Sequence, residues 1–240
     1  MLRRILPILL LTNSACGRTP PPPPAVVAPP ATPVAPPAAP AVPPPAAPSP
    51  TVALVLPPAD VGDIAPNFSL LDTDGKVVEL GTFKGKPVVL EWFNPGCPFV
   101  KYAHEEGPLK NLAHKYAEKG VVWLAVNSSA PGREGAGKDR NVAARAAWEL
   151  DHPVLLDETG LVGKHYGATR TPEVFVLDKD RKIVYHGAPD NLPGGNLAEG
   201  EGEEPYLVNA LDAVLAGKPV AKTKTQPRGC SVKYADEAPH

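Results

Sequence analysis

The sequence has no stripe of basic residues, no glycine loop of the phosphate-binding kind, no metal-ligand spacing and no internal repeat. Lysine and arginine together number 24 and aspartate and glutamate 26, so the charge is nearly balanced. Nucleic-acid binding needs a basic footprint, and nucleotide and metal sites need their own ligand patterns. We therefore expect no nucleic-acid partner and no cofactor.

Long apolar runs are also absent. Arg3 and Arg4 precede a short apolar run, Ile5–Leu11, and small residues lead to Cys16. The run is too short to span a bilayer as a helix, but charged, apolar and small segments in this order are typical of a secretory signal. Residues 1–15 are therefore predicted to be a signal peptide. Cys16 resembles the lipid-acceptor cysteine of bacterial lipoproteins, although Asn13 stands where leucine is usual. This resemblance implies a lipid anchor in the cell envelope, facing the periplasm.

Proline dominates the next segment. Between residues 20 and 58 lie 18 of the 33 prolines, mixed with alanine and valine, and no charged residue occurs between Arg18 and Asp60. Such a composition favours an extended, disordered spacer. We assign residues 16–58 to an anchor and linker, 59–225 to one domain, and 226–240 to a C-terminal tail.

The domain shows an alternating α/β pattern. A nearly continuous apolar run, such as Val121–Ser128, is typical of a strand buried on both faces. The order βαβαβ, then a hairpin and a helix, predicts a central mixed sheet with helices on both faces. The expected strands are 76–80, 87–93, 121–128, 154–156, 173–177 and 182–186, and the expected helices are 99–118, 139–150, 163–166 and 205–216.

The most informative stretch is 88–101, V-V-L-E-W-F-N-P-G-C-P-F-V-K. A β-type run meets the turn N-P-G, and Pro98 then suits the first turn of a helix. Cys97 is thus predicted at or next to the N-cap. The free backbone N–H groups and the positive end of the helix dipole favour a thiolate there. The alternative is a buried structural cysteine.

These residues resemble the thioredoxin-like superfamily, in the redoxin branch of bacterial envelope thiol–disulfide proteins. The resemblance runs from Asp60 to Ala216 and is carried by V-G-D-I-A-P-N-F-S-L (61–70), V-V-L-E-W-F-N-P-G-C (88–97) and T-R-T-P-E-V-F-V-L-D (169–178). It implies a thioredoxin-like fold, Cys97 as nucleophile, and a cis-proline segment that places Thr171 and Pro172 beside the thiol. An X-Pro bond is compatible with the cis form.

The sequence departs from the family patterns at three positions. Val100 replaces the second cysteine of C-x-x-C, so Cys97 has no thiol partner one turn along. Peroxiredoxins carry threonine or serine three residues before the reactive cysteine, where this chain has Asn94, and proline four residues further upstream, where it has Leu90. Asn94 and Leu90 count against a peroxidase.

Glu91 lies six residues before Cys97, where thioredoxins bury an acid. By resemblance it would relay a proton to or from the Cys97 sulfur. Desolvation in an apolar strand is expected to raise the pKa of Glu91, as a proton shuttle requires. The alternative is a partly solvated glutamate in a salt bridge, with Lys101 or Lys86 as partner.

Cysteine is scarce, and the count carries information. Of the three cysteines, Cys16 belongs to the signal, which leaves Cys97 and Cys230. A pair makes a disulfide possible in an oxidising compartment. Cys230 lies in the polar segment T-Q-P-R-G-C-S-V-K-Y beyond the last helix, which we expect to be mobile enough to reach Cys97. The alternative is a tail thiol without a role.

The histidines indicate no site. His104 lies seven residues past Cys97 on the predicted helix, about 10 Å away, which is too far for joint ligation of a metal. His114, His165 and His186 have no partner at a ligand spacing.

The sequence is therefore interpreted as an envelope thiol–disulfide oxidoreductase with Cys97 as nucleophile and Cys230 as resolving thiol. Its expected partners are a protein or small-molecule disulfide substrate, an external thiol reductant and, through the lipid anchor only, a membrane. One alternative is a thiol peroxidase that uses the same two cysteines. The other is a non-catalytic copper-handling or chaperone-type module, which would need a second soft ligand close to Cys97.

Overall fold

The computed structural model describes residues 57–196 and 202–236. The predicted signal peptide, Cys16 and all but the last two residues of the predicted linker lie outside these ranges. None of the helices within them has the length and apolar character needed to cross a bilayer.

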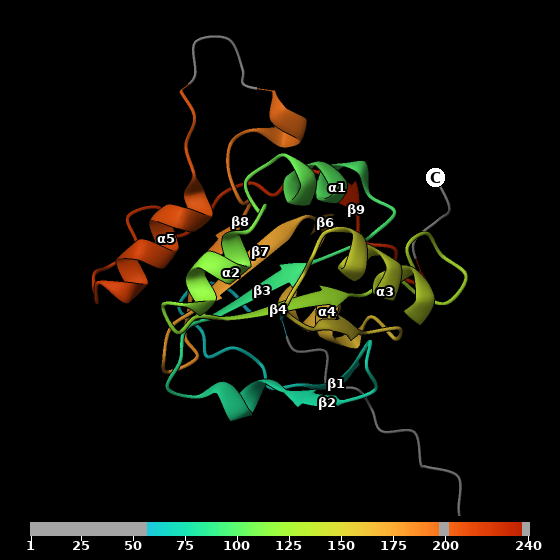
Figure 1. Ribbon diagram of the computed structural model, residues 1–240. Helices are drawn as coiled ribbons and strands as arrows, with labels where there is room; N and C mark the ends of the chain where they lie inside the picture. Colours follow the sequence, from blue (N-terminus) through green and yellow to red (C-terminus); the bar gives the residue numbers. More distant parts are fainter. Residues whose placement is uncertain (1–56, 197–201, 237–240) are drawn as a thin grey trace, which may run out of the picture. The chain divides into compact units, whose positions relative to one another are not determined.

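A seven-stranded mixed sheet forms the centre of the domain (Figure 1). Its order is β2-β1-β5-β4-β3-β7-β8, with β3, β4 and β5 parallel and the other neighbours antiparallel. The strands are β1 (Ser69–Asp72), β2 (Val77–Glu79), β3 (Val88–Trp92), β4 (Val122–Asn127), β5 (Val154–Leu156), β7 (Glu173–Leu177) and β8 (Ile183–Gly187). The predicted mixed α/β sheet is confirmed.

The apolar composition of β3 explains its place in the sheet. All five of its residues are buried, and it pairs with β4 on one side and β7 on the other. Side chains alternate between faces in a strand. Accordingly Val88, Leu90 and Trp92 join the core cluster on one face, and Val89 joins the cluster on the other. Burial of each such side chain stabilises the fold by about 1.5–3 kcal/mol.

Helices cover both faces, as predicted. On the Val89 face lie α1 (Pro98–Glu105), α2 (Leu112–Ala117) and α5 (Tyr206–Leu215), whose apolar residues share one cluster. α3 (Lys138–Ala147) contributes Ala144 to a smaller cluster with Cys97. On the opposite face, α4 (Leu161–Tyr166) places Tyr166 against Trp92, with ring centroids 5.3 Å apart. Two short 3-10 turns, Leu80–Phe83 and Pro193–Gly195, complete the helical elements of the described residues.

The single helix predicted over 99–118 is wrong. The structure has two helices, α1 and α2, with a break over residues 106–111. Gly107 and Pro108 lie in the break, and proline disfavours helical backbone at the residue before it and lacks an N–H. Asn111, just before α2, has a left-handed φ of 55°. The chain therefore changes direction at this point.

The C-terminal tail is ordered and packed, in contrast to the mobile tail expected from its polar sequence. β9 (Cys230–Ser231) pairs antiparallel with β6 (Arg170–Thr171) in a separate two-stranded sheet. Beyond it, Val232 and Tyr234 are buried in the main core cluster. The sequence signal that was overlooked is the alternation of polar and apolar residues in S-V-K-Y (231–234).

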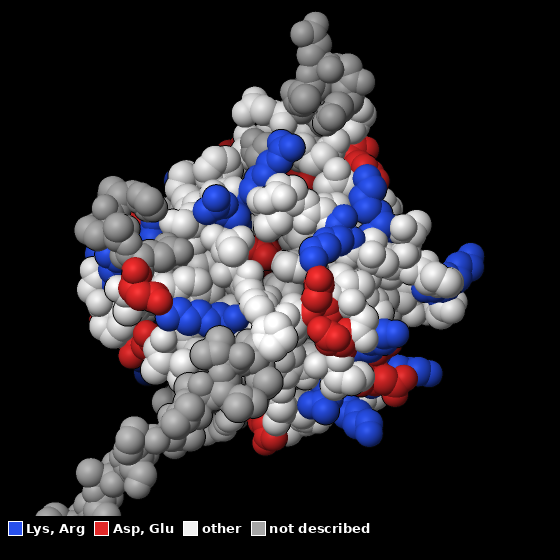
Figure 2. Space-filling view, turned by 180° about the vertical axis from the view of Figure 1, so that it is seen from behind, with Lys and Arg blue, Asp and Glu red and all other residues white. Residues whose placement is uncertain are grey.

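Charge is mixed on the surface. On the face shown in Figure 2, lysine and arginine side chains are interspersed with aspartate and glutamate. The balanced charge of the sequence is thus also spread in space on this face.

Candidate active site

The turn after β3 delivers Cys97 to the start of α1. Asn94 shapes this turn: its carbonyl accepts the Cys97 backbone N–H at 3.0 Å, and its side-chain Oδ1 accepts the Gly96 N–H at 2.7 Å. Cys97 is the N-cap residue of α1, with extended backbone, and Pro98 occupies the first helical position. The structure therefore places Cys97 where the sequence predicts it.

The Cys97 side chain lies in an apolar cluster with Phe93, Val100 and Ala144, and the residue is 1% exposed. Its thiol donates a hydrogen bond to the carbonyl oxygen of Thr171 at 3.2 Å. The Thr171–Pro172 peptide bond is cis. The structure thus brings Thr171 into contact with the thiol, as the resemblance implied.

Cys230 reaches the same residue from the other side. In the β6–β9 pair, Cys230 stands opposite Thr171, and its side chain packs against the cluster that contains Cys97. Gly229 makes this approach possible, because a Cβ atom there would lie 2.1 Å from the Thr171 oxygen. Both cysteines are free thiols. The fold therefore holds the two sulfurs together, and no mobile tail is needed.

The two thiols differ in environment. Burial raises the pKa of Cys230 to about 12, and the hydrogen bond and charge of the neighbouring Cys97 sulfur act in the same direction. A raised pKa keeps Cys230 in the neutral thiol form at physiological pH.

Glu91 is fully buried, but the expected rise of its pKa is wrong. Burial does raise the pKa of Glu91, yet the charge and hydrogen bond of His104 outweigh it and lower the pKa overall. His104 Nε2 lies 2.7 Å from Glu91 Oε1, and the Trp123 indole donates to Oε2 at 2.9 Å. The alternative partners, Lys101 and Lys86, are not the ones used; Lys101 instead lies 3.9 Å from Glu105.

Glu91 therefore belongs to a buried cluster on the α1 side of β3. The His104 ring stacks on Trp148, with centroids 5.4 Å apart and 5° between the planes. It also contacts Phe93 edge-on, at 5.8 Å. Phe93 belongs to the cluster that surrounds Cys97. The hydrogen bonds of the Glu91 carboxylate are made to His104 and Trp123, so a proton relay from Glu91 to Cys97 stays a prediction.

The positions that depart from the family patterns have structural roles. Val100, in place of a second cysteine, is a completely buried residue of α1. The Asn94 side-chain Nδ2 donates to the Glu134 carbonyl at 3.2 Å and to Ser129 Oγ at 3.4 Å. Because its amide oxygen is also engaged by Gly96, Asn94 is committed to holding the loops around Cys97.

A second buried acid was missed by sequence reasoning. Glu173, the first residue of β7, is 1% exposed. Its Oε1 atom lies 2.5 Å from His186 Nε2. The missed signal was a charged residue directly before the apolar run V-F-V-L. His114 and His165 lie apart from the thiols. His114 pairs with Asp151 at 2.8 Å on the surface, and His165 is exposed.

No group of three or more histidine, cysteine, aspartate or glutamate side chains within residues 57–196 and 202–236 is arranged to hold a metal ion. The two cysteine sulfurs are the soft ligands that the copper-handling alternative would use. Nothing in this part of the chain favours that alternative over redox chemistry.

Comparison with known proteins agrees with this geometry. The profile of the Redoxin family matches residues 60–202. Thiol-disulfide oxidoreductase ResA of Bacillus thuringiensis subsp. konkukian is 34% identical over 129 residues, which cover 52% of this chain and 68% of that protein. Chloroplastic Peroxiredoxin Q of Triticum aestivum is 32% identical over 135 residues, or 52% of this chain and 57% of that protein.

Among solved structures, an uncharacterized conserved protein from Geobacillus kaustophilus has a TM-score of 0.66 at 34% identity, covering 75% of this chain and 94% of that one. The mixed sheet and its structural relatives establish the thioredoxin-like fold that the sequence predicted. Similarity to thiol–disulfide oxidoreductases makes the protein an oxidoreductase enzyme with a thiol–disulfide redox function. With 143 consecutive residues matched by the profile, residues 60 to 202, the chain belongs to the redoxin family.

Proposed function

We propose that this enzyme reduces disulfide substrates with Cys97 as nucleophile and Cys230 as resolving thiol. One observation carries the proposal. The Thr171 carbonyl accepts a hydrogen bond from the Cys97 thiol at 3.2 Å, and Thr171 stands opposite Cys230 in the β6–β9 pair. A disulfide between two cysteines needs close and well-directed side chains. The convergence of both thiols on Thr171 supports such a bond.

The reaction has two exchange steps. The Cys97 thiolate attacks one sulfur of a substrate disulfide, which forms a mixed disulfide and releases the other sulfur as a thiol after it takes up a proton. Cys230 then loses its proton and attacks Cys97 Sγ, which releases the second substrate thiol and forms a Cys97–Cys230 disulfide. An external dithiol or two thiols supply the two electrons that return both cysteines to the reduced form.

The electrostatics of Cys230 support this order. Burial and the Cys97 sulfur both raise the pKa of Cys230 while Cys97 is free. Once Cys97 carries a substrate sulfur, its charge and its hydrogen bond no longer act on Cys230. The second thiol then ionises more readily, and thiolate is the attacking form. Formation of the mixed disulfide thus makes it easier for Cys230 to attack that disulfide.

Disulfide mapping tests the proposal. After mild oxidation, differential alkylation and mass spectrometry are expected to find Cys97 and Cys230 in one disulfide within a single chain. Pairing between chains, or an alkylatable Cys230 after full oxidation of Cys97, would contradict an intramolecular resolving role.

We also propose that the enzyme is exported and held at the bacterial envelope through lipidated Cys16. The support is the sequence order of Arg3 and Arg4, an apolar run and small residues before Cys16. Fatty-acid labelling of the wild type but not of a Cys16→Ser variant would test the anchor.

Thiol peroxidase activity is the second candidate. The similarity to Peroxiredoxin Q favours it, and so does the Thr171 hydroxyl, a buried Oγ1 atom without a hydrogen-bond partner among the described residues. Peroxide reduction needs a hydroxyl or similar donor near the reactive sulfur. Asn94 is engaged with loop residues and is not free to serve as one.

We expect Cys97 to react with hydrogen peroxide no more than about tenfold faster than an ordinary thiolate, while exchange with small disulfides is rapid, because Asn94 stands in place of the peroxiredoxin threonine and its side chain is engaged with the loops. Stopped-flow oxidation of the reduced protein measures both rates. Oxidation at peroxidase speed would favour the second candidate, and its loss in Thr171→Val would assign the donor.

A further inference from the structure

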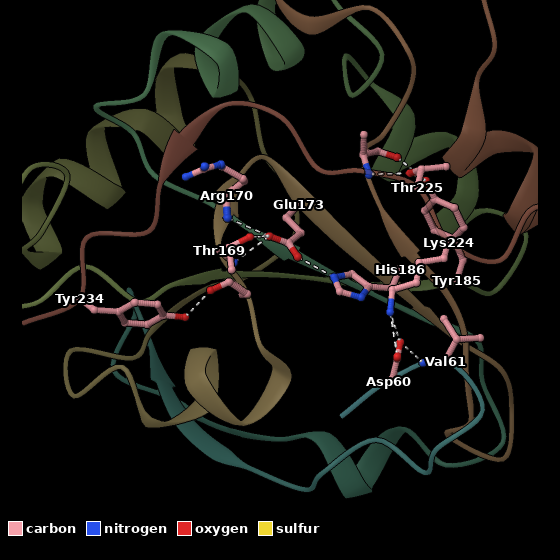
Figure 3. Close-up of polar contacts among 12 residues, drawn as sticks. Asp60, Val61, Thr169, Arg170, Glu173, Tyr185, His186, Lys224, Thr225 and Tyr234 are labelled. Atoms are coloured by element: carbon pink, nitrogen blue, oxygen red, sulfur yellow. Dashed lines mark hydrogen bonds and ion pairs between the residues drawn. The ribbon is translucent and has the colours of Figure 1, made fainter. Parts of the chain in front are cut away.

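We propose that Glu173 is a positioning residue for the resolving step, acting through the backbone of β6. The inference rests on the proposed roles of Cys97 and Cys230. Glu173 follows Pro172 directly, and its buried carboxylate is held between two elements (Figure 3). One carboxylate oxygen accepts hydrogen bonds from Arg170 in β6 and from Thr169 just before it, and the other contacts His186 in β8.

On the β6 side, Glu173 Oε2 accepts the backbone N–H groups of Thr169 and Arg170, each at 2.8 Å. The Thr169 hydroxyl donates to the same oxygen at 3.3 Å. In Figure 3 the Arg170 side chain points away from this cluster, so it is the backbone of Arg170 that Glu173 holds. The next residue is Thr171, whose carbonyl accepts the Cys97 thiol.

The same short segment carries the tail. β6 pairs with β9, so that Arg170 stands opposite Ser231 and Thr171 opposite Cys230. The Val232 N–H then donates to the Thr169 carbonyl at 3.1 Å. The two backbone N–H groups that Glu173 fixes therefore belong to the segment that places Cys230 beside Cys97.

On the β8 side, Glu173 Oε1 contacts His186, and the His186 ring stacks on Phe175 with centroids 3.9 Å apart. The backbone of His186 binds the segment just before the tail: its N–H donates to the Thr223 carbonyl, and its carbonyl accepts the Thr225 N–H, both at 3.0 Å. The Glu173–His186 pair thus joins the two places where the chain is attached on either side of residues 226–229, at Thr223–Thr225 and at β9.

This arrangement gives Glu173 a specific task. Disulfide exchange is sensitive to the placement of the attacking sulfur, and a misplacement of about 1 Å can cost a hundredfold in rate. A residue that fixes the backbone of Thr169 and Arg170, directly before Thr171 and within the β9 pairing, controls that placement without touching a sulfur. Its loss is expected to slow attack by Cys230 more than attack by Cys97.

The two attacks are separated with 5,5′-dithiobis(2-nitrobenzoate). Cys97 attacks the reagent and releases one thionitrobenzoate, and Cys230 then displaces the second from Cys97. Stopped-flow absorbance of the reduced enzyme gives both rates. In Glu173→Ala we expect the second rate to fall by about tenfold or more and the first to change by less than about threefold. Glu173→Gln, whose amide oxygen can still accept the two N–H groups, should recover most of the second rate.

Asp72→Ala is the matched control. Asp72 is also a buried carboxylate that accepts two backbone N–H groups at 2.8 Å, those of Asp74 and Lys76, but it ends β1, at the turn to β2. We expect this variant to keep the wild-type ratio of the two rates whatever its stability. If Glu173→Ala fails to fold, Glu173→Asp, whose shorter side chain cannot reach both elements, is expected to show the same selective loss.

An unchanged ratio in folded Glu173→Ala or Glu173→Asp, or an equal loss in Asp72→Ala, would overturn the positioning role. Release of a single thionitrobenzoate by the wild type would overturn the resolving role of Cys230, and the role of Glu173 with it. The stoichiometry of the wild type thus tests the proposed function, and the ratio in the variants tests the further inference.

Discussion

Replacement of Cys230 by serine is expected to lengthen the lifetime of a mixed disulfide at Cys97 by about a hundredfold or more. The reason is effective concentration: a thiol held beside its target reacts as if present far above the millimolar level of external thiols. The structure holds Cys230 opposite Thr171, which contacts the Cys97 thiol. The lifetime is measured by trapping Cys97 with a disulfide substrate and following the adduct by non-reducing electrophoresis.

The fold should survive this change. The β6–β9 pairing uses backbone atoms, and Val232 and Tyr234 still anchor the tail in the core. Ser231→Ala, one residue along β9, is the control and should leave the adduct lifetime unchanged. Cys97→Ser should form no adduct and show no turnover. Equal lifetimes in the wild type and in Cys230→Ser would make the enzyme a one-cysteine redoxin that depends on an outside reductant.

Replacement of Glu91 by glutamine is expected to cost about 3 kcal/mol in the free energy of unfolding near neutral pH, because the carboxylate is the shared hydrogen-bond partner of buried His104 and Trp123 and breaking such a buried pair is strongly destabilising. Glu91 and His104 lie 2.7 Å apart with side chains 0% and 2% exposed. Glu118→Gln is the matched control. It removes the glutamate of a surface pair, 4.0 Å from His114 and 73% exposed, and should change stability by less than about 0.5 kcal/mol. Urea unfolding measures both.

The Glu91 effect should depend on pH in one direction. Burial raises the pKa of Glu91, but the charge and hydrogen bond of His104 outweigh it, so the folded-state pKa is lowered. A lowered pKa stabilises the fold above the unfolded pKa of about 4.3, and this stabilisation is lost as the pH falls through the folded value. The difference between wild type and Glu91→Gln should therefore be full above about pH 5 and shrink below about pH 4. A difference that is constant or grows with acid would contradict the ion pair.

Local sequence was sufficient for six of the seven strands of the main sheet, all but β1, and for the placement of Cys97. Strand β3 is an apolar run interrupted by Glu91 alone. The turn N-P-G, with Pro98 after the cysteine, determines where α1 begins, because these residues restrict their own backbone. The same kind of signal was overlooked at Gly107–Pro108, where it ends α1. The charge balance and the proline-rich segment were likewise readable from composition, while the signal before Cys16 stays a prediction.

Only the tertiary structure decided which of these residues meet. Cys230 lies 133 positions after Cys97, and its place beside Thr171 comes from two buried side chains, Val232 and Tyr234, that anchor an otherwise polar tail. The partner of Glu91 proved to be His104 rather than a lysine. Glu173 contacts His186 on β8, the next strand of the sheet. Such pairings depend on strand register and on which face each side chain occupies, and neither is encoded by spacing along the chain.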